Sequence, residues 1–349
     1  MLLHLRQPAL NGTPISVTYN TEAGRFRYLG RPATSLAKMA ENEAKCMRYP
    51  IFQTAFSTAT LVLALVAASK SNAQVGPNID DLARELANPG AANATMNFKL
   101  EFRGYDGDLP GASVQDSTTL TFQPVLPFVL NNGNNLIFRP AFSYGWGTPR
   151  QDPSIGSFNG LNSWNDIPYD LLYSWQAGTW TVGAGIVGSV PVGSDASSDN
   201  WLLGPSFLAV KTLDWGVTGI FPFHNEKIGG SGADTSITSL QYFLFYGLGN
   251  GWQIGTGPTV SYDWKAPSGQ EWTVPVQLAL AKTTAIGEQI VKFNFSVEKN
   301  IVRPDPFAEE WTLTFNVSPV TKNPFQPTPR DPPVDAVTRA AVLAPIRTN

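Results

Sequence analysis

Between residues 96 and 318, apolar and polar residues alternate one by one along a series of segments. The first such segment runs from Met96 to Arg103, and its apolar set is Met96, Phe98, Leu100 and Phe102. Only a β-strand sorts alternate residues onto two faces, because an α-helix repeats every 3.6 residues. The same rhythm recurs to residue 318, so this range is predicted to be all-β.

Twelve segments carry the alternation, and the connections between them alternate in length. The predicted strands lie near residues 96–103, 118–126, 135–144, 167–175, 179–190, 201–211, 215–223, 237–246, 251–264, 271–282, 289–299 and 310–318. Short turns are predicted at 131–134, 176–178, 212–214, 247–250 and 285–288, and longer loops at 104–117, 147–166, 191–200, 224–236, 265–270 and 300–309. This alternation is typical of an up-and-down outer-membrane barrel, whose short turns face the periplasm. We therefore predict an antiparallel transmembrane β-barrel of about twelve strands in the outer membrane of a Gram-negative bacterium, with periplasmic N- and C-termini.

The segment Gly251 to Trp264 has aromatic residues near both ends of one face. Twelve residues separate Trp252 from Trp264. At about 3.3 Å per residue and a tilt of roughly 40°, the two rings are about 30 Å apart along the membrane normal, the spacing expected of two aromatic girdles. The residues predicted at the membrane interfaces are Trp252, Tyr262, Trp264, Trp272 and Trp311.

A soluble β-sandwich also alternates, and composition weighs against it. Charged residues make up 15% of the chain, below the roughly 25% of a soluble domain. The polar faces carry mostly Gly, Ser, Thr, Asn and Gln, whereas a soluble sheet normally presents Lys and Glu to water. A mean hydropathy of −0.10 and a single long apolar run exclude a bundle of membrane helices. Scattered Lys and Arg and a net charge of −3 argue against nucleic acid as a partner.

Export signals precede the predicted barrel. The apolar run Ile51 to Ala68 follows Arg48 and leads to Ser71-Asn72-Ala73, which predicts a signal peptide over residues 47–73. A membrane helix is the alternative, disfavoured by the polar residues that interrupt the run. Residues 1–46 are interpreted as a doubtful leader or a misassigned start, with translation beginning at Met39 or Met47. Cys46, the one cysteine, precedes the cleavage site, so no disulfide is expected.

Two further segments flank the barrel. Residues 74–95 are predicted to be a periplasmic segment with a short amphipathic helix, Ile79 to Ala87, capped by Asn78. Residues 319–349 are rich in proline and are expected to be disordered. The barrel itself is predicted over residues 96–318.

Proline interrupts six predicted strands. Because proline cannot donate a ladder hydrogen bond, each should mark a bulge, a kink or a strand end. Two roles remain open: bulges that serve the fold only, and a weak place in the wall through which an apolar solute leaves sideways. The six are Pro124, Pro140, Pro205, Pro222, Pro258 and Pro275.

Charged residues on the faces opposite the apolar ones should point into the barrel lumen. They either fill a narrow interior with ion pairs or line a solute path and set its selectivity. The lumen-lining candidates are Lys99, Glu101, Arg103, Arg139, Asp170, Asp263, Lys292 and Glu298.

No catalytic constellation is evident. His224, the one histidine after the predicted cleavage site, is expected at the loop end of a strand, and no Ser pairing with it is evident. No Cys/His cluster suggests a metal. We expect no enzyme activity, no metal and no cofactor.

Six stretches, taken in order, resemble a known family. They are Asp81 to Pro89, Phe122 to Pro127, Trp201 to Thr212, Gly251 to Trp264, Ser268 to Val276 and Ile301 to Asp305. They resemble the outer-membrane transporter family linked to the meta-pathway of phenol degradation, often mislabelled neuromedin U, over roughly residues 79–318. The resemblance implies an outer-membrane barrel of transport function and fixes no substrate.

The expected function is passive, selective passage of a small solute, aromatic or apolar in character. The alternative is a non-transporting barrel whose extracellular loops bind a ligand or a surface partner. Expected partners are outer-membrane lipids, the barrel-assembly machinery during biogenesis and the small-molecule solute, with no nucleic acid.

Overall fold

The computed structural model describes three short N-terminal strands and residues 78–152, 156–323 and 325. The chain divides into two compact units, Met1–Pro50 and Ile51–Asn349. The first contains β1 (His4–Leu5), β2 (Ser16–Asn20) and β3 (Arg25–Leu29), paired antiparallel in that order. The predicted signal peptide, most of the predicted leader and most of the proline-rich tail lie outside the described residues.

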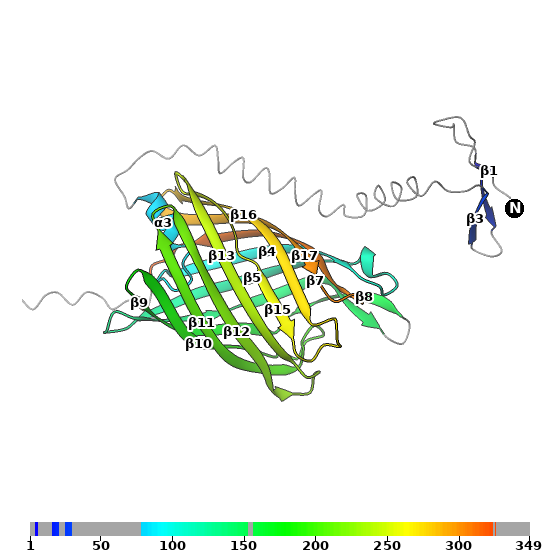
Figure 1. Ribbon diagram of the computed structural model, residues 1–349, viewed down its shortest axis with the longest axis horizontal. Helices are drawn as coiled ribbons and strands as arrows, with labels where there is room; N and C mark the ends of the chain where they lie inside the picture. The colour runs from blue at the N-terminus through cyan, green and yellow to red at the C-terminus, as the bar shows by residue number, and fades with distance from the viewer. Residues whose placement is uncertain are drawn as a thin grey trace, which may run out of the picture. The chain divides into compact units, whose positions relative to one another are not determined.

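The second unit contains a closed antiparallel β-barrel of twelve strands, which confirms the predicted fold class (Figure 1). Closure comes from β4, which pairs with β5 on one side and with β18 on the other. Three barrel strands are interrupted and appear as the pairs β6/β7, β8/β9 and β14/β15. The segments are β4 (Thr95–Asp106), β5 (Asp116–Val129), β6 (Asn135–Pro140), β7 (Phe142–Asp152), β8 (Ser157–Trp164), β9 (Ile167–Ala177), β10 (Trp180–Val190), β11 (Asn200–Leu213), β12 (Gly216–Gly230), β13 (Ser236–Gly249), β14 (Trp252–Thr256), β15 (Thr259–Asp263), β16 (Trp272–Ile286), β17 (Gln289–Val302) and β18 (Ala308–Pro319).

Short and long connections alternate around the barrel as predicted, so one end carries the short turns and the other the long loops. We call these the short-turn end and the long-loop end. Strands extend into several of the predicted loops, and farthest into two of them. Within the predicted loop 147–166, β7 continues to Asp152 and pairs with β8, and β12 runs on to Gly230 into the predicted loop 224–236. Backbone pairing extends these strands where the apolar alternation has already faded, so periodicity could not reveal them.

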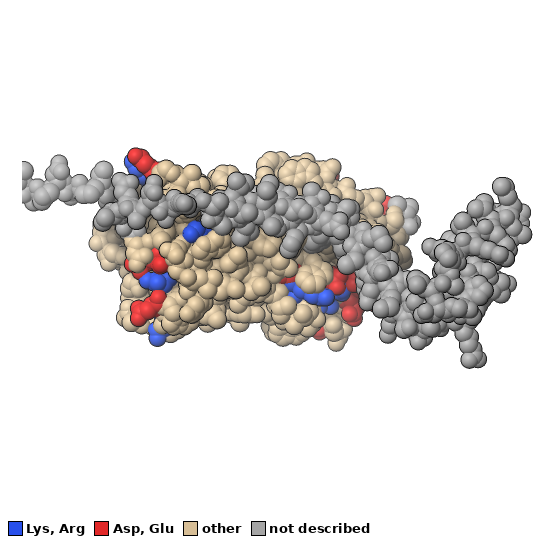
Figure 2. Space-filling model, turned by 90° about the horizontal axis from the view of Figure 1, so that it is seen from above, with Lys and Arg blue, Asp and Glu red and all other residues tan. Residues whose placement is uncertain are grey.

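The outer face of the barrel is apolar. Its exposed side chains include Phe98, Leu120, Phe207, Ile220, Leu244 and Leu278. On the face shown in Figure 2, most Lys, Arg, Asp and Glu gather toward the two ends of the barrel, with a largely uncharged band between them. A continuous apolar belt of this kind is rare on soluble proteins and is the surface that lipid tails cover.

Each of the six prolines predicted to interrupt a strand lies at an interruption of the ladder. Pro140 ends β6, Pro258 lies between β14 and β15, and the register with β17 shifts between Val274 and Pro275. The paired positions of β11 and β12 are interrupted around Pro205 and Pro222. Pro124 lies where β5 changes partner from β7 to β6. The missing N–H groups are therefore placed where pairing is already broken.

The N-terminal helix α3 spans Ile79–Glu85, two residues shorter than predicted. Asn78 caps it as expected, because its side-chain oxygen accepts a hydrogen bond from the Asp80 N–H at 3.1 Å. The helix ends early because the N–H groups of Ala87 and Asn88 bond to the carbonyls three residues back and tighten the last turn. Within the described residues, no helix is both long and apolar enough to span a membrane.

Candidate functional site in the barrel interior

The barrel interior has two chemically different halves. The inner faces of β9 to β13 form an apolar half, whereas the inner faces of β4, β5 and β16 to β18 form a polar half. In the apolar half the packed side chains are Leu172, Val187, Leu208, Val210, Val217, Phe221 and Phe243, with Phe223 and Phe245 against them. The polar half carries ion pairs and amide hydrogen bonds instead.

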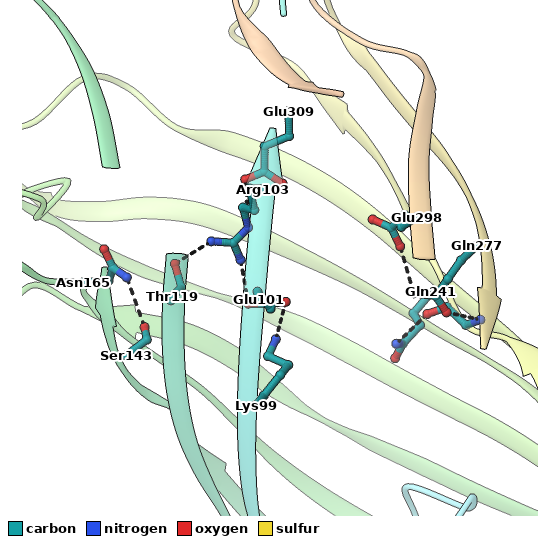
Figure 3. Close-up of polar contacts among 11 residues, drawn as sticks. Lys99, Glu101, Arg103, Thr119, Ser143, Asn165, Gln241, Gln277, Glu298 and Glu309 are labelled. Atoms are coloured by element: carbon teal, nitrogen blue, oxygen red, sulfur yellow. Dashed lines mark hydrogen bonds and ion pairs between the residues drawn. The ribbon is translucent and has the colours of Figure 1, made fainter. Parts of the chain in front are cut away.

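One network of the polar half is built on Glu101 in the middle of β4. Its carboxylate contacts the Lys99 ammonium at 3.0 Å and the Arg103 guanidinium at 2.7 Å. Arg103 also donates to the Thr119 hydroxyl at 2.8 Å and reaches the Glu309 carboxylate at 3.3 Å (Figure 3). Alternation along β4 places the three charged residues on one face, and the neighbouring strands β5 and β18 supply the remaining partners.

A second network joins β13 to the polar strands β16 and β17. Gln277 on β16 donates to the Glu298 carboxylate at 3.0 Å and accepts from the Gly257 N–H at 2.9 Å. Gln241 on β13 donates to the Gly257 carbonyl at 3.2 Å. Gly257 belongs to the break between β14 and β15, so the two glutamines satisfy backbone groups that the broken strand leaves free. Figure 3 shows both networks.

Residues 78–94, which we call the inner segment, are fixed to the short-turn end. The Asp80 carboxylate accepts hydrogen bonds from the N–H groups of Asn250 and Gly251, in the turn between β13 and β14. Arg84 donates to the carbonyl of Asp214, in the turn between β11 and β12, at 2.9 Å. Two neighbouring hairpin turns therefore hold α3.

Past α3, the inner segment runs inside the barrel against the apolar half. Ala87 packs on the apolar cluster. Ser174 donates to the Gly90 carbonyl at 2.9 Å, and Asn88 donates to the Thr181 hydroxyl at 2.9 Å. A Cβ on Gly90 would lie 2.7 Å from a methyl group of Thr181 and 2.8 Å from one of Leu208, so any larger residue would force these side chains to shift.

A cavity of about 510 Å³ remains between the inner segment and the polar half. Strands from opposite sides of the barrel line it, which places it inside the lumen. Its walls include Lys99, Arg139, Phe243, Phe245 and Lys292, and the inner segment contributes Asn93. A second cavity, of about 470 Å³, lies between the inner segment and the short-turn ends of β9 to β11. The inner segment therefore narrows the lumen without filling it.

The structure brings most of the predicted lumen residues to one place. Five line the larger cavity: Lys99, Glu101, Arg139, Lys292 and Glu298. Arg103 and Asp170 each form an ion pair with one of these five, and the Arg139 to Asp170 contact measures 2.8 Å. Asp263 does not line the cavity; it lies at the end of β15, where its carboxylate accepts from the Lys265 N–H at 2.8 Å.

The sequence reasoning missed the aromatic wall and the inner segment. Phe243 and Phe245 share a strand with Leu240, Tyr242 and Leu244, so both faces of β13 are apolar and simple alternation does not show which face is internal. A strand that is apolar on both faces is itself the signal of burial on the inside as well as contact with lipid. A prediction that places only polar residues inside the barrel misses these rings.

Three of the predicted interface aromatics form one cluster at the long-loop end. The ring of Tyr262 contacts those of Trp264 and Trp272 edge-on, at centroid distances of 4.7 and 4.9 Å. Trp252 lies at the opposite end of the interrupted strand, with the Lys282 ammonium 5.2 Å from its ring. The Lys299 ammonium lies 4.6 Å from the ring of Trp311. Aromatic rings with a nearby cation suit the boundary between lipid tails and headgroups.

His224 lies within β12 and not in a loop, which corrects the sequence prediction. The strand extends past it because β12 stays paired with β13 as far as Glu226. Its ring nitrogens contact the Thr238 hydroxyl at 2.9 Å and the Glu226 carboxylate at 3.2 Å. In the described part of the chain, no three His, Cys, Asp or Glu residues gather closely enough to hold a metal ion.

Comparison with protein-family models gives no match, and comparison with curated proteins gives none either. Among solved structures, the COG4313 outer membrane channel from Pseudomonas putida F1 is 12% identical, with 66% of this chain and 96% of that chain covered and a TM-score of 0.48. The NanC porin is 10% identical over 65% of this chain and 99% of that chain, with a TM-score of 0.41. The Pseudomonas putida toluene transporter TodX is 12% identical over 69% and 93%, with a TM-score of 0.33. At these identities, function has to be argued from the residues of this chain.

Proposed function

We propose that this protein is an outer-membrane channel of a Gram-negative bacterium that passes a small solute by passive diffusion. The apolar belt and the closed ladder support insertion in a bilayer, because only a closed barrel leaves no strand edge unpaired in lipid. Both barrel termini, Thr95 on β4 and Pro319 on β18, lie at the short-turn end. We place that end in the periplasm, so the inner segment enters the barrel from the periplasmic side.

The observation that carries the proposal is the cavity of about 510 Å³ with a polar wall inside the closed barrel. A barrel that served only as a scaffold could fill its interior with packed side chains, as the apolar half does. The polar half instead leaves space beside charged and amide groups that water can solvate. Its ion pairs stabilise the wall, and the same groups offer a solute hydrogen-bonding partners along its path.

The order of the six stretches between Asp81 and Asp305 also supports membership in the outer-membrane transporter family linked to phenol degradation. In this proposal the partners are the surrounding lipids, the barrel-assembly machinery and the solute. The five interface aromatics then lie at the two membrane boundaries.

The test is the conductance of the purified protein in planar lipid bilayers. We expect discrete conductance steps in potassium chloride, and flux of small solutes into liposomes that contain the protein. A heat-unfolded sample of the same preparation is the control. Absence of both conductance and solute flux from folded protein would contradict the channel and favour a barrel whose outer loops bind a ligand.

A further inference from the structure

Lys292 differs from the other cations that line the larger cavity. Lys99 has the carboxylate of Glu101 at 3.0 Å, and Arg139 has that of Asp170 at 2.8 Å. Among the described residues, no carboxylate lies within 4.0 Å of the Lys292 ammonium. Its partners are the Leu86 carbonyl at 3.3 Å and the Phe245 ring at 5.7 Å. A cation inside a barrel without a counter-ion is costly, and such a residue points to a functional site.

An aromatic surface lies beside this cation. Phe243 and Phe245 are neighbours on the inner face of β13, and both line the cavity together with Lys292. Phe245 is half-buried and Phe243 is the more buried of the two. Gly257 also lines the cavity and has no side chain that could cover the Phe245 ring. A solute can therefore contact a ring and the ammonium at the same time.

Three carboxylates line the cavity: those of Glu85, Glu101 and Glu298. Glu85, next to Leu86 on the inner segment, is exposed and its carboxylate is more than 4.0 Å from the Lys292 ammonium. The other two are already engaged. Glu101 is shared by Lys99 and Arg103, and Glu298 accepts a hydrogen bond from Gln277. Glu298 is six residues from Lys292 on the same face of β17, which is about 20 Å along the strand. The corner of Lys292, Phe243 and Phe245 thus combines positive charge with an apolar surface.

We propose that this corner is a binding site for a small organic anion with a flat, apolar body, such as an aromatic carboxylate. The anionic group contacts the Lys292 ammonium, and the body packs on Phe243 and Phe245. The cavity volume of about 510 Å³ lies in the range of about 300–1,000 Å³ that holds small organic ligands. The proposal rests on the proposed function, since it makes this corner the selective part of the solute path.

The test is calorimetric titration of the purified full chain in detergent micelles with four probes. They are benzoate, benzyl alcohol as the neutral ring, benzylammonium as the cationic ring, and acetate as the anion without a ring. We expect benzoate to bind most tightly and each of the others to bind at least about tenfold more weakly, because a hydrogen bond to a charged group and the ring contact are both needed.

Substitutions show which residues contact the probes. Lys292→Met should weaken benzoate binding at least about tenfold and change benzyl alcohol binding by less than about twofold. Phe245→Leu should weaken the binding of both benzoate and benzyl alcohol. Lys265→Met removes the same charge from an exposed loop and should change nothing. Slower gel migration after heating reports whether each variant is folded. If Lys292→Met does not fold, Lys292→Arg must keep the preference for benzoate and Phe245→Leu must weaken it.

The proposal is overturned if the wild-type protein binds none of the probes, or if benzoate binds no more tightly than benzyl alcohol, benzylammonium or acetate. It is also overturned if folded Lys292→Met binds benzoate normally. A conductance measurement distinguishes failure of the channel proposal from failure of the binding-site proposal. A protein that binds benzoate but does not conduct contradicts the channel, whereas one that conducts without binding benzoate contradicts only this site.

Discussion

The two halves of the barrel interior differ in what holds them together. Inside β9 to β13, aliphatic and aromatic side chains pack against one another, and Leu172, Val210 and Val217 are fully buried. Inside β4, β5 and β16 to β18, charged and amide groups such as Glu101 and Gln277 face a cavity. The inner segment lies on the apolar half, so the larger cavity lies along the polar half, and the smaller one is confined to the short-turn ends of β9 to β11. The apolar half therefore stabilises the barrel and holds the inner segment, and the polar half provides the route for the solute.

The largest expected effect is on stability, in the apolar half. Phe221→Ala removes a buried ring from the packed cluster and should lower the free energy of unfolding by about 3–5 kcal/mol. Gln123→Ala, on the cavity wall of the polar half, should change it by less than about 1 kcal/mol. Urea unfolding in lipid vesicles, followed by tryptophan fluorescence, measures both. Equal losses would mean that the two halves are packed alike.

A smaller loss is expected from the ion pairs of the polar half. Glu101→Gln leaves Lys99 and Arg103 without their shared carboxylate and should lower the free energy of unfolding by about 2 kcal/mol. This loss is smaller than for a dry ion pair, because the adjoining cavity has room for water. The added positive charge should shift the reversal potential of the channel toward anions. The double variant Lys99→Gln with Glu101→Gln should recover most of the stability. Failure to recover would show that the pairs do not act as one network.

A substitution at Gly90 tests whether the contact between the inner segment and the apolar half narrows the lumen. Gly90→Val places methyl groups into Thr181 and Leu208, which should cost about 1–3 kcal/mol and push the segment away from the apolar half. Displacement of the segment should raise single-channel conductance in planar bilayers. Gly229→Val is the control, because a Cβ at Gly229 lies no closer than 3.9 Å to Trp201. Unchanged conductance in folded Gly90→Val would mean that the segment does not narrow the path.

The sequence predicted the barrel but only half of its interior. Alternation along segments such as Met96 to Arg103 is enough to fix strand faces, and the lengths of the connections fix the up-and-down order. Proline positions also predicted where the ladder breaks. The strand extensions at β7, β8 and β12 could not be predicted, because hydrogen bonds between neighbouring strands hold them and apolar periodicity does not.

The candidate site was predicted less well than the fold. Charged residues on polar faces, such as Lys99 and Lys292, could be placed in the lumen from alternation alone. The pairing of Arg139 with Asp170 depends on the register between strands, which the sequence does not reveal. The same is true of Lys292, which has no carboxylate partner among the residues that the structure describes. The path of residues 86–94 inside the barrel depends on packing against Leu208 and Thr181, which lie more than 80 residues away in the chain.

The division of the interior is most directly tested by the reactivity of single cysteines. Cys46 is the one native cysteine, so Cys46→Ser provides a background for Asn294→Cys and Thr314→Cys in the polar half and Leu208→Cys and Val210→Cys in the apolar half. The rate of modification by a charged, water-soluble thiol reagent is measured on the folded barrel in lipid. The account predicts rapid modification at 294 and 314 and protection at 208 and 210. Similar rates at all four positions would contradict it.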